Sequence, residues 1–305
     1  HQRLADIYRR QQAFSKAREH AQAAVDLARQ LFGEGQVLVN ALMEQARVEQ
    51  AAGQPQLALS LWREALRILR EDSTARAQLR TADIEGYLEL LFDLAGNDPT
   101  HRQALLDEAF TVSQLGQTPA AGRAITQLAA RLAESDPEVR DTARALQDAL
   151  KNTQDLQYAL GVEQSKPYLE RNTAKEEDLK NQLREASVEY QKQEERLQSQ
   201  FPRYGRLITP NPLSTAQVSA SLKPGEALVR VLPGADATWV FLVTTDGQLQ
   251  AVEVPLTVAE LAAQVKRLRA GVDASSGHLP TFDVALAYRV YQELFGSLEP
   301  QLANV

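Results

Sequence analysis

The stretch "EQAAGQPQLALSLWREAL", residues 49–66, decides how the first part of the chain folds. Gly53 separates two runs in which apolar residues recur at helical spacing. Ala58, Trp62 and Ala65 fall on one face of the second run. Small residues on such a face let two antiparallel helices approach closely, and a large residue fills the space beside them. The stretch therefore predicts two helices that meet at a tight turn, with Trp62 in the seam.

The same pattern occurs once more, closer to the start of the chain. Ala17 precedes Ala58 by 41 residues, and Ala24 precedes Ala65 by the same distance. Gln12 stands at the position that corresponds to Gly53. Self-similarity at a period of 20–50 residues indicates stacked helical units. Residues 1–72 are therefore predicted to form two helix pairs.

These pairs resemble the tetratricopeptide repeat (TPR), with a long connecting segment at "ARQLFGEGQV", residues 28–37. Gln12 departs from the turn glycine of the pattern, and Glu49 replaces its usual aromatic residue. Since about three repeats normally stack stably, more repeats are expected before His1. The resemblance implies a concave groove that binds a protein or peptide partner. The residues that would face it are Asp6, Arg9, Arg10, Asn40, Met43, Arg47 and Gln50. The alternative is that these residues are only solvated surface positions.

The segment from 73 to 200 keeps helical periodicity. Residues 73–135 are predicted to form a further helical, repeat-like region, and residues 136–200 a long coiled-coil hairpin broken at Lys166–Pro167. The expected seam residues are Leu146, Leu150, Thr153, Leu156 and Leu160, with Leu179, Leu183, Ala186, Tyr190, Gln193 and Leu197. We favour a hairpin that closes on itself, although the seam could instead bind another chain, which leaves an oligomer possible.

The periodicity changes after residue 200. The runs 226–233 and 237–255 are rich in β-branched and aromatic residues, and Asp246-Gly247 is a strong hairpin signal. Two helices are predicted over 257–272 and 282–300. Three strands and two helices with broad apolar faces would leave the core incomplete, so more sheet is expected.

From residue 201 onward the sequence resembles the beginning of a CHAT domain, the caspase-like peptidase domain found behind tetratricopeptide repeats. The matching stretches include "FPRYGRL" (201–207), "PLSTAQVSASLKPGEALVRVL" (212–232) and "QLANV" (301–305). The resemblance implies an α+β protein, in which an all-α TPR-like superhelix and a helical hairpin precede an incomplete α/β caspase-like domain over 201–305. It also implies a parent caspase-like cysteine peptidase regulated through its repeats. The alternatives are a non-catalytic interaction scaffold and a structural homo-oligomer.

The residues themselves offer no catalytic chemistry. The chain has no cysteine, and its four histidines do not match the family's catalytic histidine: three lie in the helical part, and His278 lies in a loop. No catalytic, cofactor-binding or metal-binding residue is predicted. The net charge of −7 argues against nucleic acid, and no apolar run is long enough for a membrane span. The compartment stays open, with the cytoplasm favoured.

Overall fold

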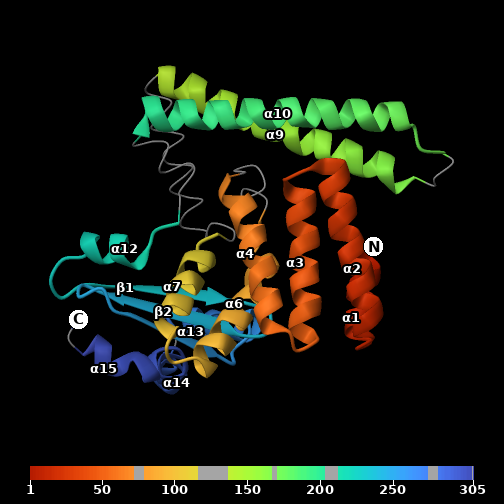
Figure 1. Cartoon of the computed structure of the whole chain (residues 1–305). Helices are drawn as coiled ribbons and strands as arrows, with labels where there is room; N and C mark the ends of the chain where they lie inside the picture. The colour runs from red at the N-terminus through yellow and green to blue at the C-terminus, as the bar shows by residue number, and fades with distance from the viewer. Residues whose placement is uncertain (72–78, 116–136, 167–169, 203–211, 274–280, 304) are drawn as a thin grey trace. The chain divides into compact units, whose positions relative to one another are not determined.

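The computed structural model describes the chain except for residues 72–78, 116–136, 167–169, 203–211, 274–280 and 304 (Figure 1). The chain divides into two compact units. The first unit comprises His1–Leu79 and Gln117–Asn211, and the second comprises Arg80–Gly116 and Pro212–Val305.

The first unit begins with two antiparallel helix pairs. The helices are α1 (Gln2–Arg10), α2 (Phe14–Phe32), α3 (Gln36–Ala51) and α4 (Pro55–Glu71). Successive helices pack on each other, and α1 also packs on α3. Ala17, Ala58, Trp62 and Ala65 are fully buried. The two predicted helix pairs are therefore confirmed, with small residues at the helix contacts and Trp62 in the seam.

The turns inside the two pairs have the same geometry. Gly53 has a φ of 72°, and Gln12 has a φ of 58°. The amide of Gln12 donates to the carbonyl of Arg9 at 3.0 Å, as the amide of Gly53 does to that of Gln50. Both turns therefore need a residue with φ in the left-handed region. Gly53 adopts this φ without strain, whereas Gln12 does not.

We expect Gln12→Gly to stabilise the repeats by about 1 kcal/mol, because a side chain in the left-handed region costs about 1–2 kcal/mol and the extra freedom of glycine in the unfolded chain offsets part of the gain. Gly53→Ala should destabilise them by a similar amount through its φ alone, since the added methyl group would meet no atom within 4 Å. Urea titration followed by circular dichroism measures both changes. An unchanged midpoint for both variants would contradict the argument.

The first unit also contains a long helical hairpin. Helices α9 (Pro137–Ser165) and α10 (Thr173–Gln200) pack on each other along much of their length (Figure 1). The buried apolar and threonine residues of the hairpin include Val139, Leu146, Thr153 and Leu160, with Leu179, Ala186, Tyr190 and Leu197. The α9 set recurs every seven residues. Leu150, Leu156, Leu183 and Gln193 of the expected seam are only half-buried.

A buried carboxylate sits near the turn of the hairpin. Glu163 is 1% exposed, and its carboxylate lies 2.7 Å from Lys166 Nζ and 3.3 Å from Lys175 Nζ. It also accepts a hydrogen bond from the amide of Asn172 at 3.1 Å. The hydrogen bond from Lys166, followed by that from Asn172, lowers the pKa of Glu163 to about 2. Glu163 therefore ties the end of α9 to the start of α10.

The second unit is built on a three-stranded antiparallel sheet. Strands β1 (Ala227–Pro233), β2 (Thr238–Thr244) and β3 (Leu249–Val254) lie in the order β1-β2-β3. The hairpin predicted at Asp246-Gly247 is confirmed, with Gly247 at a φ of 80°. The amide of Thr244 donates to the carbonyl of Gln248 at 3.1 Å and closes this hairpin.

Helices cover both faces of this sheet (Figure 1). Side chains alternate between the faces along each strand. Val240 and Leu242 pack against α13 (Val258–Ala270), α14 (Val284–Phe295), η2 (Gly296–Leu298) and α15 (Glu299–Leu302). Phe241 points to the other face and meets Phe92 and Phe110, which lie on α6 (Thr81–Asn97) and α7 (Arg102–Ser113). Helix α12 (Thr215–Ser221) also packs against β2 and α7.

This grouping differs from the sequence-based ranges. The sequence pattern predicts 73–135 as a separate repeat-like region and 201–305 as a separate domain start, whereas Arg80–Gly116 clusters with the sheet. The physical reason is that Phe92 of α6 and Phe110 of α7 pack against Phe241 of β2. The described strands pair only in antiparallel fashion, so a caspase-like α/β arrangement stays a proposal.

Candidate functional site: the charged surface of α1 and α3

The candidate site is built from the first helix of each pair. On α1, Asp6, Arg9 and Arg10 are spaced so that residues three and four apart share one face. On α3, Asn40 and Arg47 occupy the equivalent strip. Because α1 packs on α3, the two strips lie next to each other. We call the set Asp6, Arg9, Arg10, Asn40, Glu44 and Arg47 the α1–α3 charged surface.

Salt bridges connect the charges of this surface. Asp6 Oδ1 accepts from Arg9 Nη2 at 2.5 Å and from Arg10 Nε at 3.1 Å. Glu44 then joins the two helices: its Oε1 lies 3.5 Å from Arg9 Nε, and its Oε2 lies 3.4 Å from Arg47 Nη1. The structure thus brings together four of the residues predicted from sequence, through a fifth that the sequence pattern did not single out.

Burial and the neighbouring arginines have opposite effects on the pKa values of Asp6 and Glu44. Burial raises the pKa of Asp6, but hydrogen bonds from Arg10 and Arg9 outweigh it, so this pKa lies below its usual value. Burial raises the pKa of Glu44 above its usual value, although Arg47 and Arg9 oppose the shift. Glu44 therefore takes up a proton more readily than Asp6, which would weaken the link between the helices.

The remaining predicted residues differ in accessibility. Asn40 is exposed and accepts a hydrogen bond from Gln36 Nε2 at 2.7 Å, and Gln50 is half-buried. The prediction that Met43 faces the open groove is wrong, because Met43 is only 2% exposed. Helix α3 packs against α1, α2 and α4, so only a narrow strip of it stays accessible. Met43 is therefore a packing residue.

Two buried features hold α3 in place. The guanidinium of Arg47 lies 5.6 Å from the ring centroid of Trp62, so the seam aromatic also orients a residue of the charged surface. Glu49, which replaces the usual aromatic residue, is buried. Its Oε1 and Oε2 accept hydrogen bonds from Arg18 Nε at 3.0 and 2.9 Å, and its Oε2 lies 2.8 Å from Arg18 Nη2. This ion pair fixes α2 against α3 where the usual repeat relies on packing.

Residues 1–71 match the family model of the tetratricopeptide repeat. The first unit therefore begins with tetratricopeptide repeats. No curated protein matches the chain, and no solved structure matches it. The family match ends at residue 71, so the CHAT-like interpretation of 201–305 stays a proposal. Tetratricopeptide repeats suggest a role in protein interaction. The α1–α3 charged surface lies on the first helix of each pair.

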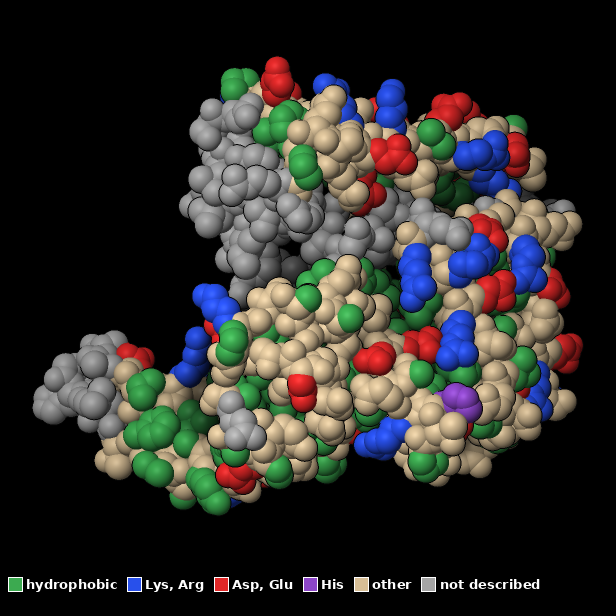
Figure 2. All heavy atoms as spheres, turned by 60° about the vertical axis from the view of Figure 1, so that its left-hand side comes forward, with side chains coloured by type: hydrophobic (Ala, Val, Ile, Leu, Met, Phe, Trp, Pro, Cys, Tyr) green, Lys and Arg blue, Asp and Glu red, His purple; other side chains and the backbone are tan. Residues whose placement is uncertain are grey.

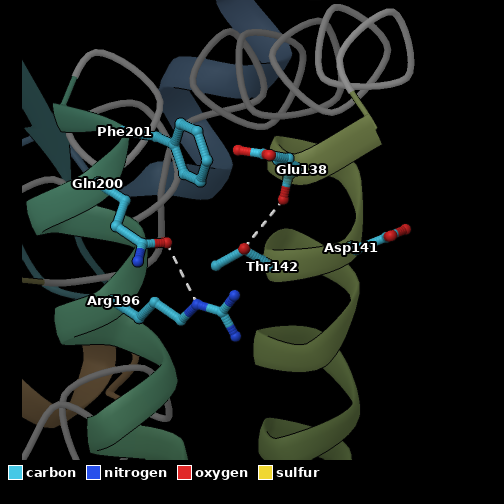
Figure 3. Close-up of a pocket in the computed structure, with 6 residues that line it drawn as sticks. All are labelled: Glu138, Asp141, Thr142, Arg196, Gln200 and Phe201. Carbon is cyan, nitrogen blue, oxygen red and sulfur yellow. Dashed lines mark hydrogen bonds between the residues drawn. The ribbon is translucent and has the colours of Figure 1, made fainter.

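A hollow lies at the end of the hairpin where α9 begins and α10 ends (Figure 3). Its lining residues are Glu138, Asp141, Thr142, Arg196, Gln200 and Phe201. Thr142 Oγ1 donates to the carbonyl of Glu138 at 2.9 Å, and Arg196 Nε donates to Gln200 Oε1 at 3.2 Å. Asp141 points away from the others (Figure 3). These six residues do not form a nucleophile–base pair, so the hollow does not carry a catalytic proposal.

The described residues contain no group of three or more histidines and carboxylates that could hold a metal ion. Among the helices that the structure describes, none is long and apolar enough to cross a membrane. His278 lies outside the described residues.

Proposed function

We propose that this chain is a protein-interaction module whose α1–α3 charged surface binds a segment of a partner polypeptide. The observation that carries the proposal is the meeting of Asp6, Arg9, Arg10 and Arg47 in one network on two neighbouring helices of matched tetratricopeptide repeats. These residues would lie apart if the two helix pairs stacked differently.

The chemistry of the surface favours a partner segment that carries carboxylates. Guanidinium groups donate several hydrogen bonds in a fixed geometry that matches a carboxylate. The Arg10 side chain is 73% exposed, and it pairs with Asp6 of its own helix. A partner carboxylate can bind to Arg10 at little cost to the fold, because exposed ion pairs contribute only about 0–1 kcal/mol.

The test compares two charge reversals in matched positions. Arg10 and Arg70 are both exposed arginines in the last turn of a helix, on α1 and α4. The full chain is used to capture proteins from a lysate of its source, and cross-linking with mass spectrometry maps the contacts. We expect Arg10→Glu to weaken capture of the partner that cross-links to α1 and α3 several-fold, and Arg70→Glu to leave it unchanged. Equal behaviour of the two variants, or cross-links confined to other helices, would reject the proposal.

A second proposal concerns the parent protein. The resemblance of 201–305 to the beginning of a CHAT domain supports a caspase-like cysteine peptidase, with the repeats as its regulatory part. Such a peptidase needs a thiolate nucleophile and a histidine base. The chain contains no cysteine, so these 305 residues do not provide the nucleophile.

This second proposal is tested first by reading the coding sequence after Val305, and then by assaying the full-length protein for peptidase activity. Downstream His-Gly and Ala-Cys motifs, together with substrate cleavage that a Cys→Ala variant loses, would support it. Absence of the pair would leave the alternative, a non-catalytic scaffold with a structural CHAT remnant.

A further inference from the structure

Strand β1 forms an outer edge of the sheet in the second unit. The amide of Gly234 donates to the carbonyl of Ala237 at 2.8 Å, which fixes the alternation of hydrogen bonds between β1 and β2. In an antiparallel pair every second residue turns its N–H and C=O away from its neighbour. On β1 these residues are Ala227, Val229 and Val231, and the described residues provide no hydrogen-bond partner for their backbone groups.

The side chains at this edge are apolar on both faces of the sheet. Val229, on the face covered by α14 and α15, is 40% exposed, and Leu228, on the opposite face, is 37% exposed. The equivalent residues of the central strand, Leu242 and Val243, are fully buried. Proteins usually protect edge strands with outward charges or proline. Here Pro233 stands at one end, and Arg230 is the one charged residue before it. Figure 2 shows one face of the molecule, with hydrophobic side chains at its surface.

Arg230 supplies the one charge of this strand. Its Nε donates to Ser113 Oγ at 2.9 Å, and its Nη2 donates to the carbonyl of Ser113. These acceptors are neutral, and burial lowers the pKa of this arginine, with no contribution from a carboxylate in the part of the chain that the structure describes. A largely buried cation without a counter-charge is unfavourable unless one is supplied. If an antiparallel strand were added along the outer side of β1, its residue opposite Arg230 would form a non-hydrogen-bonded pair with Arg230. Side chains in such pairs lie close together.

We propose that β1 binds an extended segment of a partner polypeptide as a fourth strand, with apolar residues facing both layers and an Asp or Glu opposite Arg230. The backbone groups of Ala227, Val229 and Val231 select an extended strand over a helix, since the interior of a helix has no free backbone groups to pair with them. The charge of Arg230 selects the acidic residue. This surface belongs to the second unit and does not depend on the α1–α3 charged surface.

The test uses the full chain and a labelled peptide in fluorescence anisotropy. The probe is KGTVEVVVGK carrying fluorescein, in which the seventh residue lies opposite Leu228 when Glu lies opposite Arg230. It is compared with the same peptide carrying Lys in place of Glu, and with the same peptide carrying N-methyl groups on alternate amides. We expect the acidic probe to bind at least about tenfold more tightly than the Lys peptide, as for a charge-assisted contact. The N-methylated peptide should not bind, because it cannot form the ladder.

Three variants locate the binding. Val229→Pro removes an outward donor and leaves the β1–β2 ladder intact, so it should weaken binding about tenfold or more. Glu253→Pro is the matched control, because Glu253 occupies the outer side of β3 at the opposite edge. Arg230→Met should remove the preference for Glu over Lys. Hydrogen exchange of the β2 amides checks that each variant keeps its sheet.

Three results would overturn the proposal. The first is equal binding of the N-methylated and unmodified peptides, a comparison that needs no protein variant. The second is equal affinity for the Glu and Lys peptides. The third is a concentration-dependent dimer of the chain alone that Val229→Pro dissociates, since β1 would then pair with a second copy.

Discussion

Replacing Trp62 by alanine is expected to lower the free energy of unfolding of the tetratricopeptide repeats by about 3–5 kcal/mol. Trp62 is the largest fully buried side chain of these helices and lies in the seam between α3 and α4. Its removal leaves a cavity that the surrounding helices fill only in part. The contact with the guanidinium of Arg47, at 5.6 Å from the ring centroid, is lost as well. Since a small domain is stable by only about 5–15 kcal/mol, this change removes a large part of that stability.

Hydrogen exchange with mass spectrometry measures this effect locally. Amides of α3 and α4 should lose protection in Trp62→Ala and keep most of it in Trp62→Phe, which still fills much of the seam. Leu57→Ala is the control on the same helix, because Leu57 is exposed and its loss should change stability by less than about 0.5 kcal/mol. A loss in Trp62→Ala no greater than in Leu57→Ala would show that the seam does not hold the repeats together.

The repeats can be predicted because their information is local. Periodicity of the apolar residues indicates helices, and the spacing of Ala17 and Ala58 aligns the two pairs. The turn at Gln12 follows from its correspondence with Gly53, although glutamine is a poor residue for a left-handed turn.

The charged surface can be predicted only in part. Spacing along one helix places Asp6, Arg9 and Arg10 together. The same spacing applies to Glu44, which lies three residues before Arg47 and four after Asn40. That spacing could have identified Glu44 as a member of the charged surface. Its contact with Arg9, however, depends on how closely α1 packs on α3. The burial of Met43 depends on the same packing, so periodicity along α3 alone could not reveal it.

The grouping of α6 and α7 with the sheet lies beyond the sequence pattern. An amphipathic helix shows which of its faces is buried and does not show against what. Here α6 and α7 pack against β2 through Phe92 and Phe110. Arg230 of β1 also donates a hydrogen bond to Ser113 of α7, which lies 117 residues earlier in the sequence. Contacts of such long separation leave no periodicity to detect.

Phe241→Ala is therefore the prediction that tests this grouping. Phe241 is fully buried on the central strand, and its ring centroid lies 5.9 Å from that of Phe92 and 5.8 Å from that of Phe110. Truncation of such a side chain costs about 3–5 kcal/mol, and edge-to-face ring pairs add about 0.5–1.5 kcal/mol each. We expect the second unit to lose most of its stability.

Hydrogen exchange again provides the measurement, because it separates the parts of the chain. Amides of β1, β2, α6 and α7 should lose protection together, since the rings of α6 and α7 pack on the strand that is changed. Amides of α2 and α3 should keep their protection. Phe282→Ala, which truncates an exposed phenylalanine of the same unit, is the matched control and should leave all of these amides protected. If α6 and α7 stay protected while the sheet exchanges freely, these helices are stabilised elsewhere and form a region separate from the sheet, as the sequence pattern predicts.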